Sequence, residues 1–433
     1  MRRKAGEFVH NEAFAFAAYA IVFAASIVSG ARAPRYGVAL LIALVPYALY
    51  FDAGATTLTL SKFALVGLTI GLLIYRVPLE TFYAAAFLRL FAAAALMVLT
   101  TAISISYAQF TGPAVRETLK ACEYLLLFIV VYTAARVDPD PQLQKIIVAL
   151  SVLVVAIMAL AQEWHGAPSQ LATGGVAVPR IAGTLEGPNQ LAGYLGIALP
   201  LLAAFCVQRF DALIATATFS ASAALVLTFS RGGIVATIVA VAIVLFLSRA
   251  SALRTAITFV AGLAAGFACV ATWAFATRMP PIFWFWTLES TNPGGVGTHG
   301  ALWRAAIMQW RAHPWFGIGA GNFEYRLSSA GIHGVKTHAN SLYLQNLAEQ
   351  GIFGIAATFF LIWQSIAAFV RDLAESPFAL GAFAASIGLA LHQIVDLMIF
   401  YPKVGAWWWI VMALGAAAAT SRKDAPTAEA AAS

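Results

Sequence analysis

Charged residues are scarce in this chain of 433 residues. Only 10% of the residues are Asp, Glu, Lys or Arg, whereas 61% are apolar, and the mean hydropathy is +0.82. A soluble globular chain carries about 25% charged and about 45–50% apolar residues. The deficit excludes a water-soluble enzyme, a disordered regulator and a collagen-like rod. With so few polar groups to face water, most of the surface must face lipid.

Other absences narrow the class further. The three cysteines lie inside apolar runs, with no disulfide framework and no metal-type Cys/His spacing. The net charge of +7 is not gathered into a basic cluster, so nucleic-acid binding is not indicated. No cleavable signal pattern is present. Alternating runs of about 10 residues, typical of a membrane β-barrel, are also missing.

Long apolar runs are abundant instead, and a membrane-spanning helix needs about 20 mostly apolar residues. They predict an all-α, polytopic membrane helical bundle, with residues 1–433 as a single integral-membrane domain. The candidate runs are roughly 13–30, 37–51, 56–75, 82–104, 116–135, 146–163, 189–207, 213–229, 232–248, 255–277, 350–370, 377–400 and 403–420.

Basic residues in short loops predict the orientation of these runs, because they collect on the cytoplasmic side. The Arg2-Arg3-Lys4 start and the Arg422-Lys423 tail place both termini in the cytoplasm. Two cytoplasmic termini require an even number of spans. We therefore expect about 12 transmembrane helices, with the short run at 37–51 or a neighbour not spanning independently.

Two segments on the opposite side interrupt the pattern. Residues 164–188, rich in Gly and Pro, form the shorter periplasmic loop, and residues 278–340 form a long one. Long loops in compact bundles are usually functional or disordered. The aromatic residues of 278–340 predict an ordered cap over the site at the membrane interface. Within it, 299–312 reads as an amphipathic helix with Trp303, Ile307 and Trp310 on one side.

Histidine is concentrated in the long loop, which holds four of the seven. His is the side chain that exchanges a proton near neutral pH. His338 stands where the loop re-enters the apolar region, followed by the polar Asn340 and Ser341, and is the strongest candidate for chemistry. The four loop histidines have no compact metal-ligand spacing, so no metal site is predicted.

Three arginines fall on the same predicted face. Arg231 occupies a Gly-rich turn between two short apolar runs, Arg180 precedes Gly187-Pro188-Asn189, and Arg304 lies in the loop helix. A charge near lipid depth is costly and marks a functional hypothesis. Because guanidinium groups match phosphate oxygens, these arginines could form an anion site.

Two other patterns have plainer interpretations. Gly317–Asn322 resembles a nucleotide-binding glycine loop, but no strand precedes it, so we expect a tight turn. His392 and Asp396 are four residues apart in an apolar run and would share a helix face. We interpret them as a satisfied buried pair; a proton relay is the alternative.

Taken in order, five short motifs resemble the bacterial O-antigen ligase and O-antigen polymerase superfamily of membrane glycosyltransferases. Each motif is short and degenerate, so the resemblance rests on their order and spacing, and it is strongest over 179–360. The motifs are Pro-Arg-Ile-Ala-Gly-Thr…Gly-Pro-Asn-Gln-Leu-Ala at 179–192, Phe-Ser-Arg-Gly-Gly at 229–233, Arg304 with Trp310, His-Pro-Trp-Phe-Gly-Ile-Gly at 313–319 and Thr-His-Ala-Asn-Ser at 337–341.

This resemblance implies an O-antigen ligase of the bacterial inner membrane with a periplasmic active site. Such an enzyme joins polysaccharide from undecaprenyl diphosphate to a sugar hydroxyl of lipid A–core, inverting the anomeric centre. It implies His338, Arg231 and Arg304 as catalytic residues, with Arg180 also at the diphosphate. Asn189 and Asn340 are secondary candidates. Ala339 stands where relatives often carry a polar residue.

The implied partners are the undecaprenyl-diphosphate-linked donor, the lipid A–core acceptor and membrane lipid. No metal, other cofactor or nucleic acid is expected, and the sequence leaves the oligomeric state open. The nearest rival is an O-antigen polymerase or a related oligosaccharyltransferase. A secondary transporter is more distant, since it would place polar residues at mid-membrane depth in both halves.

Overall fold

Helices make up nearly all of the structure, a computed structural model of the full chain. The residues that it describes are 12–47, 50–52, 57–166, 169–173, 176–248, 252–278, 299–334 and 336–420. Residues 279–298 of the expected 278–340 cap therefore lie outside the described residues. Within the described ranges, each of the thirteen apolar runs contains a helix.

The helices follow the apolar runs closely, since these residues can satisfy their backbone polar groups in lipid only within a helix. In chain order they are α1 (Glu12–Arg32), α2 (Pro34–Leu44), α3 (Leu60–Tyr75), α4 (Ala85–Ser104), α5 (Thr111–Val137), α6 (Pro141–His165), α7 (Pro188–Gln208), α8 (Ala212–Leu227), α9 (Arg231–Ser248), α10 (Ala252–Ala276), α12 (His299–Ala312), α13 (Leu342–Ala367), α14 (Pro377–His392) and α15 (Pro402–Thr420). Short 3-10 helices are η1 (Leu79–Tyr83), η3 (Phe323–Tyr325), η4 (Leu327–Ala330) and η5 (Met398–Phe400).

Seven of the described helices are long and apolar enough to cross a membrane: α4, α5, α6, α7, α9, α10 and α13. Five more apolar helices or helix segments are shorter, with 10–17 residues each. Among them α2 has 11 residues, and at about 1.5 Å per residue it is too short to span alone. The chain is a multi-pass membrane protein, and the count of twelve spans stays a prediction.

Two small hairpins accompany the helices. Strands β1 (Tyr50–Asp52) and β2 (Thr57–Thr59) pair antiparallel, as do β3 (Ser169–Thr173) and β4 (Val176–Arg180). The second hairpin lies within the segment predicted as the shorter periplasmic loop, 164–188. Its signal is visible in the sequence, because Gly174-Gly175 separates two short runs and is typical of a two-residue hairpin turn.

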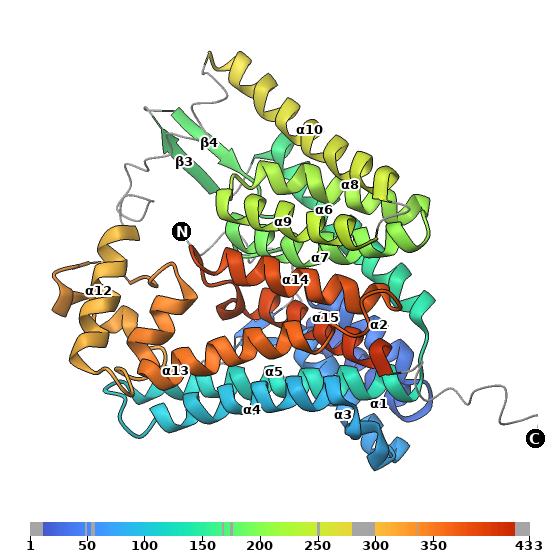
Figure 1. Cartoon of the computed structure of the whole chain (residues 1–433), viewed down its shortest axis with the longest axis horizontal. Helices are drawn as coiled ribbons and strands as arrows, with labels where there is room; N and C mark the ends of the chain where they lie inside the picture. The colour runs from blue at the N-terminus through green and yellow to red at the C-terminus, as the bar shows by residue number, and fades with distance from the viewer. Residues whose placement is uncertain are drawn as a thin grey trace, which may run out of the picture.

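The core of the bundle is built around α7, because most residues of this helix are buried. This helix contacts α8, α9, α14 and α15, which surround it in the middle of the molecule (Figure 1). Helices α4, α5 and α13 form a second layer beside them. The β3–β4 hairpin and α12 lie on the same side of the molecule, at the left of Figure 1.

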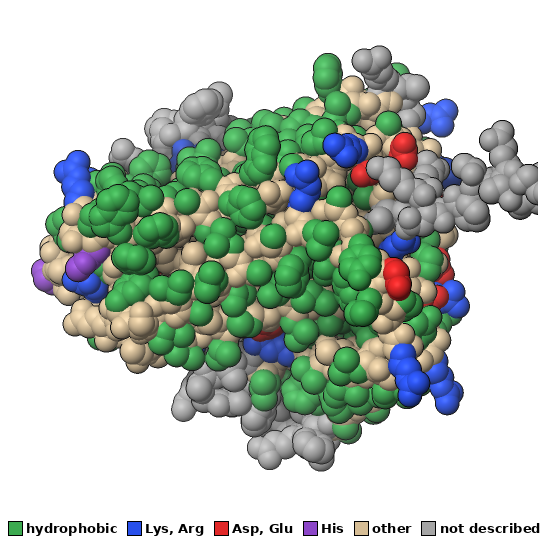
Figure 2. Space-filling view, turned by 60° about the horizontal axis from the view of Figure 1, so that its bottom comes forward, with side chains coloured by type: hydrophobic (Ala, Val, Ile, Leu, Met, Phe, Trp, Pro, Cys, Tyr) green, Lys and Arg blue, Asp and Glu red, His purple; other side chains and the backbone are tan. Residues whose placement is uncertain are grey.

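The surface supports the membrane assignment. Hydrophobic side chains cover the middle of the face in Figure 2, histidines lie at the end with α12, and most acidic side chains lie at the other end. Exposed apolar side chains include Phe246 at 82% and Phe275 at 88%. In water such exposure would be unfavourable, so this surface fits contact with lipid.

Helix α13 is broken at Gly351, whose φ of 64° lies in the left-handed region. A Cβ there would lie 2.3 Å from the carbonyl oxygen of Trp315, so only glycine fits. The 314–319 segment enters the break: Ile318 donates to the Ala348 carbonyl, and Ile352 donates to the Pro314 carbonyl. The predicted tight turn at Gly317–Asn322 is confirmed, with positive φ at three of its glycines.

Candidate functional site

Arg180 ends strand β4, and the segment after it is tied to α6. The side chain of Gln162 accepts hydrogen bonds from the Ala182 and Gly183 N–H groups, at 3.0 and 2.9 Å. It also donates to the Gly183 carbonyl at 2.9 Å. These three bonds fix the backbone after Arg180, so the guanidinium projects from a rigid support.

A continuous chain of hydrogen bonds leads from Arg180 to Asp396. The Arg180 Nε donates to the Thr228 carbonyl and its Nη2 donates to Asn189 Oδ1, both at 2.7 Å. Asn189 Nδ2 then donates to Asp396 Oδ2, also at 2.7 Å. Asn189 thus fixes both Arg180 and Asp396, and it lies in the first turn of α7.

Burial perturbs both charged ends of this chain. It raises the pKa of Asp396 to about 6, although the Leu397 N–H, Asn189 and Arg180 favour the ionised carboxylate. Burial also lowers the pKa of Arg180 to about 10, an effect that the Asp396 charge opposes. Arg180 therefore stays cationic at neutral pH.

Arg231 is the first residue of α9, and the turn before it is strained. Phe229 adopts a φ of 53°, a left-handed conformation that costs a non-glycine residue on the order of 1–3 kcal/mol. The N–H of Ser230 is held by Thr228 Oγ1 at 3.1 Å. Because Thr228 also accepts from Arg180 through its carbonyl, the two arginines share one turn.

His338 presents an imidazole without a side-chain partner. Its Nδ1 is buried and has no hydrogen bond among the described residues. The ring lies 4.2 Å, centroid to centroid, from that of Phe400. Burial, and then the cation of Lys120, lower the pKa of His338 to about 4, while Glu117 opposes them. The imidazole is therefore neutral at pH 7, with a lone pair available.

One connection joins these separate pieces: residues 393–400, between α14 and α15. Its Asp396 carboxylate holds the Arg180 chain, and its Phe400 ring packs on His338. The Leu342 N–H, four residues beyond His338, donates to the Gln393 and Asp396 carbonyls at 3.0 and 3.1 Å. The 393–400 connection thus contacts both the arginine side and the histidine side.

The Arg231 turn packs on the same connection. A Cβ added at Gly232 would lie 2.5 Å from Val395 Cγ2, and one at Gly233 would lie 3.1 Å from His392 Cε1. The two glycines after Arg231 therefore allow close contact between the start of α9 and the end of α14. Three of the candidate residues, Arg180, Arg231 and His338, are arranged around the 393–400 connection.

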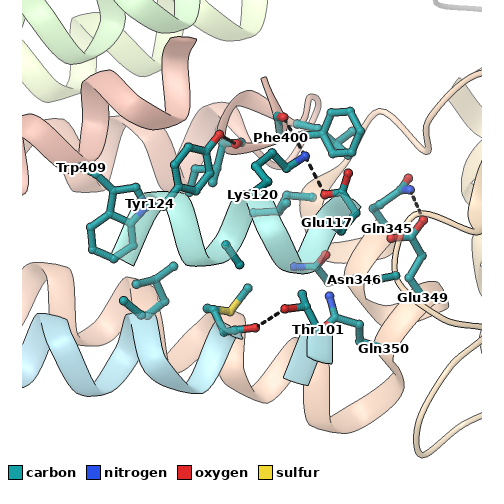
Figure 3. A pocket seen from close by; sticks show the side chains of 18 residues that line it. Thr101, Glu117, Lys120, Tyr124, Gln345, Asn346, Glu349, Gln350, Phe400 and Trp409 are labelled. Atoms are coloured by element: carbon teal, nitrogen blue, oxygen red, sulfur yellow. Dashed lines mark hydrogen bonds and ion pairs between the residues drawn. The ribbon is translucent and has the colours of Figure 1, made fainter. Parts of the chain in front are cut away.

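Beside His338, the first half of the chain contributes an ion pair. Lys120 Nζ lies 2.6 Å from Glu117 Oε2, donates to the Phe400 carbonyl at 3.1 Å and sits 3.7 Å from the centre of the Phe400 ring. Figure 3 shows both side chains at a cavity of about 90 Å³. Gln345 and Glu349 of α13 lie on its opposite side.

Arg304 and Asn340 differ from the other candidates. Arg304 is exposed on α12, with no hydrogen bond or ion pair to any described residue. Burial, and then the cation of Arg231, lower the pKa of His299, so the first residue of α12 lies near Arg231. Asn340 has a φ of 50°, so strained backbone flanks His338 as it flanks Arg231.

One predicted detail is wrong. Helix α14 ends at His392, so Asp396 does not share a helix face with it and instead bonds Asn189 and the Leu397 N–H. The helix expected at 299–312 is present as α12, and Trp303, Ile307 and Trp310 are half-buried on it. The buried residues are Leu302, Ala305, Ala306 and Gln309.

Several polar residues of the site were not predicted from the sequence. Glu117 and Lys120 lie at the start of an apolar run that reads as a plain span. Only their charge in a lipid-facing segment could have marked them. Among the described residues, no three His, Cys, Asp or Glu side chains converge as a metal site would require.

Comparison with known proteins identifies one family. Residues 216–359 match a family model described as O-antigen ligase. The matched segment runs from α8 into α13 and includes Arg231, Arg304 and His338, whereas Arg180 and Asn189 precede it. A comparison with curated proteins finds no match to the chain.

Proposed function

We propose that this chain, which matches the O-antigen ligase family model over residues 216–359, acts as the ligase itself. It would transfer polysaccharide from undecaprenyl diphosphate to a sugar hydroxyl of lipid A–core. The observation that carries this proposal is the buried, unpartnered Nδ1 of a neutral His338, beside a connection that also holds two arginines. A buried nitrogen without a partner requires an explanation, and a substrate hydroxyl would supply the missing partner here.

His338 is the proposed general base. The acceptor hydroxyl is a weak nucleophile, and its proton passes to the imidazole as its oxygen attacks the anomeric carbon. The new bond joins that carbon to the acceptor oxygen. The bond between the carbon and the diphosphate oxygen breaks, and the electron pair leaves with the diphosphate. A direct displacement of this kind inverts the anomeric centre.

The arginines are the proposed diphosphate ligands. Negative charge develops on the leaving diphosphate, and preorganised cations stabilise such charge strongly. Arg180 suits this role because its guanidinium is already fixed in place: Nε donates to the Thr228 carbonyl and Nη2 donates to Asn189. Arg231 lies on the adjoining turn, and Arg304, exposed on α12, would reach the diphosphate from the cap. Asn340 would help to orient substrate beside His338.

The membrane arrangement is part of the proposal. We place the protein in the bacterial inner membrane with twelve spans, both termini cytoplasmic and the site facing the periplasm. On the face in Figure 2 the histidines lie at the α12 end, which is the end expected to face the periplasm. The 164–188 and 278–340 segments would then cover the site and exclude water, which favours transfer over hydrolysis.

The test is transfer in vitro by the purified, full-length protein in detergent. Undecaprenyl-diphosphate-linked glycan and lipid A–core are supplied without metal or nucleotide. We expect a lipopolysaccharide ladder that disappears in His338→Ala and Arg304→Ala. Longer lipid-linked chains with unmodified lipid A–core would instead indicate a polymerase. A folded protein that forms neither product would leave transport as the function to test.

A further inference from the structure

The orientation of His338 has an unusual source. A catalytic histidine is commonly held by a carboxylate or carbonyl at its second ring nitrogen. Here no described residue bonds Nδ1 of His338, and Phe400 offers only a ring face. The imidazole direction must therefore come largely from the backbone that carries it.

That backbone is held by Gln345. Its Oε1 accepts a hydrogen bond from the N–H of Ala339, the residue after His338, at 2.8 Å. Gln345 is only 3% exposed and Ala339 is fully buried, so water does not compete for this bond. A single side chain thus fixes the peptide next to the histidine.

Gln345 is itself held by Glu349, one turn further along α13. Gln345 Nε2 donates to Glu349 Oε1 at 2.7 Å, as Figure 3 shows. Glu349 also accepts from the Gly321 N–H at 2.9 Å and the Phe323 N–H at 3.0 Å. All three partners are donors, which suits a carboxylate that can only accept, and both of its oxygens are bonded. The carboxylate thereby ties the His338 segment to the turn that enters the α13 break.

We propose that Gln345 is a positioning residue for His338, with Glu349 as its anchor. The pair links the Ala339 N–H to the 317–323 turn through four hydrogen bonds. It acts on the histidine through the main chain and leaves Nδ1 of the ring without a protein partner. This inference rests on the proposed role of His338 as the base.

The first test is the Gln345→Ala variant, assayed as the full-length protein in detergent with both lipid substrates. It removes the bonds to Ala339 and to Glu349 together. We expect kcat to fall about 10–100-fold, since a small misplacement of a reacting group costs about 100-fold. The KM values for donor and acceptor should each change less than about threefold, because a positioning residue acts on the chemical step rather than on substrate binding.

Asn346→Ala is the matched control. Asn346 is the next residue of α13 and lines the same cavity, and its Nδ2 donates to Thr358 Oγ1 at 2.8 Å. It loses a buried hydrogen bond of the same kind, but one that does not reach the His338 segment. We expect its kcat to stay within about threefold of wild type. An equal loss in both variants would reduce the effect to general destabilisation and overturn the proposal.

Exchange of the pair separates positioning from folding. Gln345→Glu alone sets two carboxylates against each other without a donor between them. In the combined Gln345→Glu and Glu349→Gln variant, the amide at position 349 donates instead, and the carboxylate at 345 still accepts from Ala339. The amide gives up the acceptor of the Phe323 N–H, so we expect the combined variant to recover part of the kcat lost in Gln345→Glu. No recovery with both proteins folded, as judged by thermal unfolding, would overturn the proposal.

The His338→Ala background distinguishes this inference from the proposed function. If Gln345 acts through His338, adding Gln345→Ala to His338→Ala causes no further loss of residual transfer. Independent, multiplying losses would overturn the positioning role alone. Normal transfer by His338→Ala would remove the base assignment, whatever Gln345→Ala does. If His338→Ala is inactive while Gln345→Ala is fully active, the base assignment stands and only the positioning role of Gln345 is overturned.

Discussion

The arginine side and the histidine side of the candidate site are held in opposite ways. Arg180 is fixed through its own guanidinium by the Thr228 carbonyl and by Asn189, which is in turn held by Asp396. His338 has no such contact at Nδ1 and is held through the backbone and through ring packing. The difference matches the two tasks, because a cation can stabilise charge while bonded elsewhere, whereas a base needs its lone pair free.

The two sides also differ in the free-energy cost of burying their side chains. A buried arginine without partners would be strongly unfavourable, so its hydrogen bonds are needed for the fold as well as the site. A neutral histidine can be buried at much lower cost. Loss of the arginine contacts should therefore affect folding and activity together, and loss of the histidine should affect activity alone.

The largest expected effect is that of His338→Ala. General base catalysis contributes about 10²–10⁴-fold, so kcat for transfer should fall by that order. The thermal unfolding temperature in detergent should stay near wild type, since no hydrogen bond of Nδ1 is lost. Transfer assays and unfolding curves on the same preparation measure both. Near-normal transfer would show that the base lies elsewhere.

Arg180→Lys should come next, with kcat/KM for the donor about 10²-fold lower. Lysine keeps the charge, but a single ammonium cannot replace the planar fork that bonds the Thr228 carbonyl and Asn189 together. Unlike His338→Ala, this variant should also unfold at a lower temperature. Arg209→Lys, at the far end of α7, is the control. A donor KM and stability equal to wild type would contradict the assigned role of Arg180.

Much of the architecture was predictable because a chain in lipid must satisfy its backbone hydrogen bonds internally, which favours helices. Every apolar run became a helix, since unsatisfied backbone groups cannot face hydrocarbon. The start of α13 was not predicted correctly: the run was placed at 350–370, and the helix begins at Leu342. Gln345, Asn346 and Glu349 lower the hydropathy there, and only tertiary packing shows that these polar side chains face one another inside the protein.

The site was predictable in part for a related reason. Arg180 and Arg231 stand out because they lie in Gly-containing turns between apolar runs, and His338 stands out because the long loop re-enters the apolar region there. Asp396 stood out too but was given the wrong partner. A spacing of four residues predicts a shared face only if the helix continues, and α14 ends at His392. Long-range pairs such as Asn189 with Asp396, 207 residues apart, carry no local signal.

Asp396→Asn probes the link between the two sides and should have a smaller effect. The amide keeps the shape but weakens the charge-assisted bond from Asn189, which is worth about 1.5 kcal/mol more than a neutral one. We expect transfer to fall about tenfold, mainly through donor binding. The Leu342 N–H still has its carbonyl acceptors, so His338 should remain in place. Asp372→Asn, in the segment between α13 and α14, serves as the control, and a loss in kcat alone would contradict this division.

The pH profile should show the smallest effect and separate the two sides most directly. Asp396, with its pKa raised to about 6, becomes protonated as the pH falls from 7 to 5. His338, with its pKa lowered to about 4, stays mostly neutral over that range. We expect transfer to fall about two- to fivefold between pH 7 and 5, as the Asn189 bond loses its charged acceptor.

In Asp396→Asn that early decline should vanish, leaving only the steeper loss near pH 4 that comes from protonation of His338. Profiles of kcat/KM for the two proteins measure this difference. An unperturbed histidine with a pKa of about 6.5 would instead lose on the order of 30-fold of its neutral form by pH 5 in both. A decline of that size in both proteins would mean that substrate-free His338 is far more solvated than its burial against Phe400 implies.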